Sequence, residues 1–319
     1  MMFLRFCSHS IHIITFTILV FTQGFLATTF TIVNKCGYAV WPGILANADS
    51  PKLETTGFEL GPSATRSFEA PPHWSGRLWG RTSCTFDPNS GQGSCGTGDC
   101  GSNQVECNGA GASTATLIEF SIGSGTQDFY DVSLVDGYNL PVMVEPDGGS
   151  GSCMSTGCVK DLNRMCPEEL RVGEGQGCRS ACEAFGTPEY CCSGAYSSPS
   201  TCASSSYSQF FKSACPRSYS YAYDDPTSTF TCTGADYTIT FCPSLSSRKS
   251  SMVSTGHGST EDNGSLLGDN PGSTVGSWIS GFLTGNSSSS TLPYVALFYH
   301  TTLPSFLISF FIPLLFFDF

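Results

Sequence analysis

The sequence predicts a mainly β protein: a β-sandwich that carries a lobe of loops and short helices held by disulfide bonds. Short runs of β-branched and aromatic residues are separated by turn residues, which include 35 Gly and 18 Pro among 319 residues. Long amphipathic helical patterns are absent from the sequence. The 17 Cys indicate that the chain folds in an oxidising compartment.

Four segments in the first half of the chain are predicted to be strands, because they are rich in β-branched and aromatic residues. They are residues 29–33 (TFTIV), 117–122 (LIEFSI), 129–135 and 140–144. Turn residues such as Asp136-Gly137 lie between them. We therefore expect antiparallel strands joined by short turns.

Residues 153–215 differ from this pattern, since they hold nine Cys and two short helical stretches, 167–172 and 179–185. This composition predicts a separate lobe of loops and short helices stapled by disulfides. Sixteen Cys fall between Cys36 and Cys242. Their number alone leaves the pairing open.

The first 27 residues have the pattern of a secretory signal peptide. Arg5 precedes an apolar run over 11–21, and the small residues Gly24 and Ala27 offer cleavage positions. The alternative is a short signal anchor. Cleavage here would also remove Cys7 and leave an even number of Cys.

The other end of the sequence resembles a signal for attachment of a glycosylphosphatidylinositol (GPI) lipid. Small residues at 286–290 and a spacer at 291–302 precede an apolar run at 303–317, and no Lys or Arg follows Lys249. We expect attachment at Ser288 and removal of residues 289–319. The alternative is a membrane-spanning helix, which normally carries a basic flank.

Residues 244–288 are rich in Ser, Gly and Thr, which predicts a flexible stalk. Asn263 and Asn286 lie in N-glycosylation sequons. Together with the two end signals, this predicts a glycoprotein that is secreted and tethered to the outer face of the plasma membrane.

The charge balance excludes a basic nucleic-acid binder, because 14 Lys+Arg face 26 Asp+Glu and the net charge is −12. Between residues 28 and 242 the only histidine is His73, so a Ser-His-Asp or Cys-His catalytic site is not expected. No cofactor fingerprint is present, and we expect neither a cofactor nor a metal.

Carboxylates are the remaining candidates for chemistry. Glu119 lies inside a predicted strand, and Asp128, Asp131 and Asp136 follow among aromatic residues. Acids beside aromatic rings suit carbohydrate, because acids bind hydroxyls and rings pack on the apolar faces of sugars. Two acids at a suitable separation can also hydrolyse a glycosidic bond. The alternative for Asp136, and for Asp224-Asp225, is a turn.

Four segments resemble the plant pathogenesis-related thaumatin-like proteins. They are 79–82 (WGRT), 91–100 (GQGSCGTGDC), 131–141 (DVSLVDGYNLP) and 221–232 (YAYDDPTSTFTC). The resemblance covers residues 28–243 and all 16 Cys. Asn103 departs from the signature, in a loop before Cys107.

The resemblance implies a β-sandwich, a disulfide-rich lobe at 158–215 and a small hairpin lobe at 84–107. It also implies eight disulfide bonds. These are Cys36–Cys242, Cys84–Cys95, Cys100–Cys107, Cys153–Cys232, Cys158–Cys215, Cys166–Cys178, Cys182–Cys191 and Cys192–Cys202.

Antifungal members of the family have an acidic cleft of one Arg, one Glu and three Asp. The matching positions are Arg77, Glu119, Asp131, Asp136 and Asp224, the last chosen over Asp225 by alignment. The resemblance implies a monomeric defence protein that binds β-1,3-glucan through this cleft.

Two other functions stay open at this point. The first is a weak endo-β-1,3-glucanase with Glu119 as proton donor and Asp136 as second carboxylate, in which Asp131 and Asp136 raise the pKa of Glu119 by repulsion. The second is a cell-surface scaffold or receptor component, which the predicted anchor favours.

Overall fold

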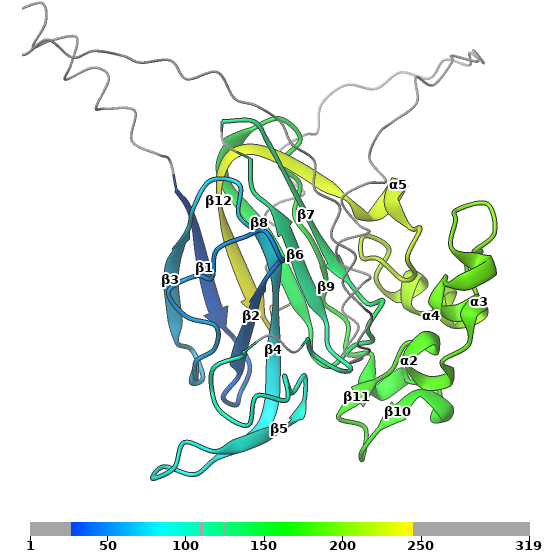
Figure 1. The fold of residues 1–319 in the computed structure, drawn as a ribbon, viewed down its shortest axis with the longest axis horizontal. Helices are drawn as coiled ribbons and strands as arrows, with labels where there is room; N and C mark the ends of the chain where they lie inside the picture. The colour runs from blue at the N-terminus through cyan, green and yellow to red at the C-terminus, as the bar shows by residue number, and fades with distance from the viewer. Residues whose placement is uncertain (1–26, 109–110, 124, 245–319) are drawn as a thin grey trace, which may run out of the picture. The chain divides into compact units, whose positions relative to one another are not determined.

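The computed structural model describes residues 27–108, 111–123 and 125–244 (Figure 1). The strands in this part of the chain are β1 (Thr28–Asn34), β2 (Trp41–Ala46), β3 (Thr65–Ala70), β4 (Ser75–Phe86), β5 (Gly93–Thr97), β6 (Leu117–Ser121), β7 (Gln127–Ser133), β8 (Val142–Ser150), β9 (Thr156–Cys158), β10 (Arg171–Val172), β11 (Gly177–Cys178) and β12 (Phe230–Phe241). The helices are α2 (Ala181–Phe185), α3 (Pro188–Cys191), α4 (Ser206–Ala214) and α5 (Asp225–Ser228), with 3₁₀ turns η1 (Asn163–Met165), η2 (Glu168–Leu170) and η3 (Gly194–Tyr196).

Ten of these strands form one curled, hydrogen-bonded sheet (Figure 1). Its order is β2-β4-β6-β7-β12-β1-β3, with β5 paired to β4, β8 to β12 and β9 to β8. The β1–β12 pair is parallel, whereas the other pairs in the described sheet are antiparallel. The predicted mainly β class is confirmed.

The predicted strands correspond to observed ones with small shifts of their ends. Residues 29–33 lie in β1 and 117–122 match β6, while 129–135 match β7, which begins two residues earlier at Gln127. The segment 140–144 becomes β8, which begins at Val142 and continues to Ser150.

One of the two helical predictions is partly wrong. In the segment 167–172 only Glu168–Leu170 is helical, as a 3₁₀ turn, and Arg171–Val172 is the strand β10. Pairing of Arg171 with Cys178 in β11 competes with the helix and ends it. The segment 179–185 contains α2, which begins after Ser180 because this side chain caps the helix through the backbone N–H of Glu183.

The main core lies on the inner face of the curled sheet and draws residues from both of its halves. The ring centroids of Phe30 and Phe120 are 4.6 Å apart, and Tyr237 packs edge-on against Phe120 at 4.9 Å. Since β1, β6 and β12 contribute these rings, the core joins distant parts of the sequence.

The disulfide-rich lobe has a smaller core of its own, which includes Leu134, Tyr138, Leu162, Leu170 and Phe211. The described residues contain eight disulfides, and their pairs are those that the resemblance implies. Cys84–Cys95 joins the two strands of the β4–β5 hairpin.

Several predicted features lie outside the described residues. They are the signal peptide at 1–27 (except residue 27), the stalk at 244–288 (except residue 244), the segment 289–319, the sequons at Asn263 and Asn286, and Ser288. Within the described part, no helix is long and apolar enough to span a membrane.

Candidate functional site

Three of the predicted site residues form a row across neighbouring strands. Arg77 of β4 pairs with Glu119 of β6, and Glu119 pairs with Asp131 of β7. Side chains directly opposite each other on antiparallel strands lie on the same face of the sheet. The next residues along these strands, which face the main core, are Leu78, Ile118 and Val132. The row therefore lies on the outer face, which we call the acidic row.

Alternation along β7 separates two acids that are close in sequence. Asp128 lies on the core side with Tyr130, and its carboxylate accepts hydrogen bonds from the Tyr237 hydroxyl and the Gly123 N–H, both at 2.8 Å. Asp131 lies three residues later and faces the other side. Asp128 is therefore a structural residue and not part of the acidic row.

The carboxylates of the acidic row are almost fully covered. Asp131 is 1% exposed and Glu119 is 9% exposed, while Arg77 is half-buried. One carboxylate oxygen of Asp131 is buried without a hydrogen-bond partner among the described residues. An uncompensated acid in such a place favours its protonated form.

The pKa of Glu119 is raised to about 7, mainly because the carboxyl group is buried; the Arg77 guanidinium opposes this rise and the charge of Asp136 adds to it. The pKa of Asp131 is also raised, first by burial and then by the charges of Glu119 and Asp225. These acids therefore hold protons at pH values at which exposed carboxylates are ionised.

Asp136 joins the acidic row from the turn after β7. The turn itself is made by Gly137, whose φ is +91° and whose N–H donates to the carbonyl oxygen of Leu134. Burial raises the pKa of Asp136 and Arg77 opposes this shift. Asp136 thus fits both readings of the sequence, as a turn residue and as a member of the acidic group.

The structure places Asp224 and Asp225 in different surroundings. The Asp224 carboxylate is 3.0 Å from the Lys212 Nζ and accepts hydrogen bonds from the N–H and hydroxyl of Ser220. Asp225 instead acts on Asp131 by charge, and it accepts a hydrogen bond from the Tyr219 hydroxyl at 3.0 Å. Asp225 is thus the one of the two whose charge acts on Asp131, while the predicted Asp224 is held by Lys212 and Ser220.

Sequence analysis did not identify Glu183 of α2 as a neighbour of this group. Its carboxylate accepts a hydrogen bond from the Thr114 hydroxyl at 2.5 Å, and burial and the charge of Asp136 raise its pKa. In the sequence Glu183 stands three residues after Ser180, a pattern that suggests a helix cap. No local signal links it to Asp136, because only the packing of the lobe brings the two together.

The arrangement suits a ligand rich in hydroxyl groups. Ionised acids accept hydrogen bonds from hydroxyls, a protonated Glu119 can donate one, and the Arg77 guanidinium donates several. The described residues contain no group of three or more His, Cys, Asp or Glu that could hold a metal ion.

Comparison with known proteins agrees with this architecture. Residues 34–243 match the thaumatin family. The chain is 63% identical over 245 residues to Thaumatin-like protein 1 of Arabidopsis thaliana, covering 74% of this chain and 91% of that protein. It is 58% identical over 222 residues to Pathogenesis-related thaumatin-like protein 3.5 of Cryptomeria japonica, covering 68% and 91%.

A third relative, from Prunus avium, is named Glucan endo-1,3-beta-glucosidase and is 50% identical over 237 residues, covering 72% of this chain and 96% of that protein. The family match extends over about two thirds of the sequence, and the relatives are covered almost along their whole length. The chain belongs to the thaumatin family.

Proposed function

We propose that the protein is an extracellular defence protein that binds β-1,3-glucan through the acidic row and its neighbours Asp136 and Asp225. The observation that carries the proposal is the alignment of Arg77, Glu119 and Asp131 on three adjacent strands. A fold stabilised only by its core has no use for two covered carboxyl groups beside a half-buried Arg on one face, since burying ionisable groups costs stability. The pathogenesis-related name of one relative and the glucan-directed name of another support the same proposal.

In this proposal the partly exposed residues around the acidic row bind the sugar, and the covered acids influence the protonation of their neighbours. Arg77, Asp136 and Asp225 are half-buried and can reach hydroxyl groups, whereas Asp131 is covered. Arg77 offers up to five N–H donors in a fixed plane, and the two Asp offer acceptors. Alternating donors and acceptors of this kind fit the hydroxyls of a glucan chain.

Hydrolysis of β-1,3-glucan is the second candidate, and the pKa of Glu119 favours it. An acid with a pKa of about 7 keeps its proton in a mildly acidic wall space and can donate it to a glycosidic oxygen. Asp136 would be the second carboxylate, acting on water or on the sugar carbon. Binding is preferred because Glu119 is only 9% exposed, and a proton donor must come within about 3 Å of the oxygen that it protonates.

A paired assay separates the two candidates. The full chain, produced in a eukaryotic secretory host, is tested for binding to insoluble β-1,3-glucan and for release of reducing ends from laminarin. Glu119→Gln and Asp136→Asn are compared with the wild type. Glu69→Gln is the matched control, because this exposed acid lies on β3, at the opposite edge of the sheet from β2.

We expect binding by the wild type and Glu69→Gln, and weaker binding by Asp136→Asn, with no release of reducing ends. If the wild type releases reducing ends and neither site variant does, the protein hydrolyses β-1,3-glucan and the binding proposal is wrong. Equal binding by the wild type and both site variants would remove the acidic row from the function.

We also propose that a GPI lipid tethers residues 28–243 to the plasma membrane. In this proposal residues 1–27 are removed, 244–288 form the stalk, 289–319 are the attachment signal and Ser288 carries the lipid. A phospholipase specific for such lipids should release the protein from plasma membrane. Retention after treatment would favour a membrane-spanning segment instead.

A further inference from the structure

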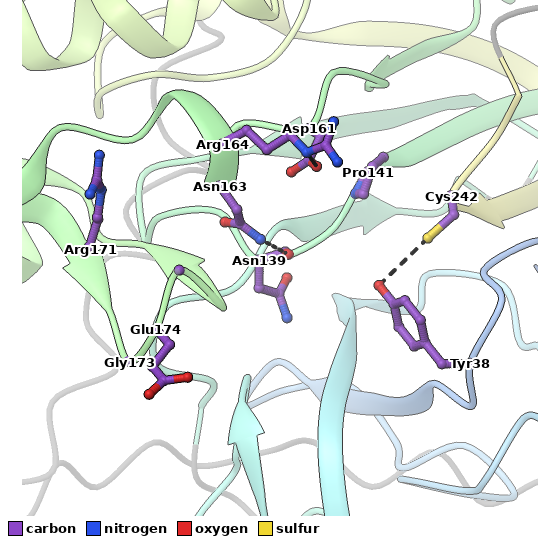
Figure 2. A pocket seen from close by; sticks show the side chains of 11 residues that line it. Tyr38, Asn139, Pro141, Asp161, Asn163, Arg164, Arg171, Gly173, Glu174 and Cys242 are labelled. Atoms are coloured by element: carbon purple, nitrogen blue, oxygen red, sulfur yellow. Dashed lines mark hydrogen bonds and ion pairs between the residues drawn. The ribbon is translucent and has the colours of Figure 1, made fainter.

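A polar pocket lies apart from the acidic row (Figure 2). Its volume is about 700 Å³, within the range of small-molecule sites, and none of Arg77, Glu119, Asp131, Asp136 or Asp225 lines it. One wall comes from loops beside the sheet, with Tyr38 and Cys242. The other comes from the disulfide-rich lobe, with Asn163, Arg171 and Glu174. The sheet and the disulfide-rich lobe thus both contribute walls to this pocket.

Tyr38 gives this pocket its one aromatic surface. The side chain is 49% exposed, and its hydroxyl lies 3.8 Å from the Sγ of Cys242. Figure 2 shows the ring on one side of the pocket and Arg171 and Glu174 on the other. A tyrosine in this position offers an apolar ring face with few rotatable bonds, so it can pack on a sugar at little cost in side-chain entropy.

Asn163 places an unused acceptor in the same pocket. Its Nδ2 donates to the carbonyl oxygens of Asn139 at 2.8 Å and Gln176 at 3.2 Å, which fixes the side-chain amide. Its Oδ1 is buried and has no hydrogen-bond partner within the described part of the chain. Buried polar atoms are nearly always paired, so this oxygen calls for a donor from a ligand or from water.

The charges that line the pocket balance. Asp161 and Glu174 are matched by Arg164 and Arg171. Asp161 and Arg164 form an ion pair at 3.4 Å, and the Nε–H of Arg171 donates to the carbonyl oxygen of Cys166 at 3.0 Å. A phosphate or a carboxylate ligand would need a net positive lining, and a lipid would need apolar walls. A neutral ligand with many hydroxyls fits both the balance and the mixture of donors and acceptors.

We infer that this pocket is a second carbohydrate site, for a short neutral oligosaccharide. One sugar ring packs on Tyr38, and a water links a sugar hydroxyl to the covered Asn163 Oδ1. This site does not depend on the acidic row. If both sites bind the same polysaccharide, the second contact becomes intramolecular and strengthens attachment to a wall or a particle.

The test measures the pocket without the acidic row. The full chain carrying Glu119→Gln and Asp136→Asn is titrated calorimetrically with laminaritetraose, cellotetraose and xylotetraose in turn. Tyr38→Ala is then added, with Tyr38→Phe as the matched control that keeps the ring. Thermal unfolding shows that each variant is folded.

We expect at least one of the three sugars to bind, with a Kd about tenfold weaker after Tyr38→Ala and within about twofold after Tyr38→Phe. The same titration of the wild type by NMR should shift the amide signals of Gly173 and Gly175, which lie in the pocket lining. NMR also serves if the double variant does not fold.

Absence of binding for all three sugars would overturn the inference. So would a Kd that Tyr38→Ala leaves unchanged, or shifts in the wild type that exclude Gly173 and Gly175. Equal glucan binding by the wild type and the acidic-row variants would overturn the proposed function and leave this site standing.

Discussion

Asp224 and Asp225 show how adjacent residues of the same type acquire different roles. Asp224 is tied into the base of the lobe by Lys212, whose Nζ also donates to the Ser218 carbonyl and the Ser228 hydroxyl. Asp225 begins α5 and acts on Asp131. Alignment of the sequence cannot tell the two apart, because the difference arises from which neighbour each carboxylate meets.

Paired substitutions test this division. Asp224→Asn should lower the free energy of unfolding by about 1–3 kcal/mol, because it leaves a largely covered Lys212 without its counter-charge. Asp225→Asn should change stability by less than about 1 kcal/mol and weaken glucan binding. Denaturant unfolding and glucan pull-down measure the two effects. If Asp224→Asn weakened glucan binding and Asp225→Asn mainly lowered stability, Asp224 would be the binding residue.

At the scale of elements, the segment Trp79–Arg81 of β4 connects the sheet to the small hairpin lobe. The Trp79 indole N–H donates to the Gly98 carbonyl at 2.7 Å. The Arg81 guanidinium is fully buried and donates to the carbonyl oxygens of Trp41, Pro42 and Val105. These residues carry much of the family resemblance, and their role here is structural.

Replacement of Arg81 should therefore cost more than loss of one charge. Arg81→Met removes the guanidinium donor from the carbonyl oxygens of Trp41 and Val105 and leaves that of Pro42 with only the Phe58 N–H, at 3.3 Å, so we expect a loss of about 3 kcal/mol or more in unfolding free energy. Arg66→Met is the control. Arg66 pairs with Glu54 at 3.5 Å on an exposed surface, so its loss should cost less than about 1 kcal/mol. Equal losses would contradict the connecting role of Arg81.

The disulfides also differ in how much they are expected to stabilise the fold, because they close loops of different length. Cys36–Cys242 joins residues 206 positions apart, whereas Cys100–Cys107 joins residues 7 apart. Chain-entropy arguments assign about 5 kcal/mol to the first and about 2 kcal/mol to the second. On denaturant unfolding, the double Cys→Ala variant of Cys36–Cys242 should lose more stability than that of Cys100–Cys107. The opposite order would show that the disulfides act mainly through contacts in the folded state and not through the entropy of the unfolded chain.

Local sequence patterns predicted the elements well where strands are repeated and bounded by turns, as at β1, β6 and β7. They failed at 167–172, where pairing of Arg171 with Cys178 overrides helical propensity. They also missed Glu183, whose contact with Thr114 joins residues 69 positions apart. Both failures involve partners that only tertiary folding supplies.

At the scale of the whole molecule, the covered acids predict a stability that depends on pH. The pKa of Glu119 is about 7 in the folded protein against a usual value of 4.5, and those of Asp131 and Asp136 are also raised. Between about pH 4.5 and 7 the folded protein therefore binds more protons than the unfolded chain. The free energy of unfolding falls as pH rises through this range. Asp87 and Glu169 have lowered pKa values and oppose the trend, but both are exposed.

Thermal unfolding from pH 4.5 to 7.5 tests this expectation. The wild type should lose about 2 kcal/mol more than Glu119→Gln over this interval, because the amide has no proton to lose. The Tm of the wild type should therefore be higher at pH 5 than at pH 7. Parallel curves for the wild type and the variant would show that Glu119 titrates normally.

The position of β12 in the sheet has a consequence for biosynthesis. This strand, Phe230–Phe241, is the last strand in the described part of the chain, but it pairs with β1, β7 and β8, which come earlier in the sequence. The centre of the sheet is therefore completed only after more than two thirds of the chain has left the ribosome. Until then β1 and β7 present open edges, and their contacts are of high sequence separation, which slows folding and exposes the nascent chain to aggregation. A chain that stops before Phe230 should accumulate on chaperones of the secretory pathway instead of leaving the cell.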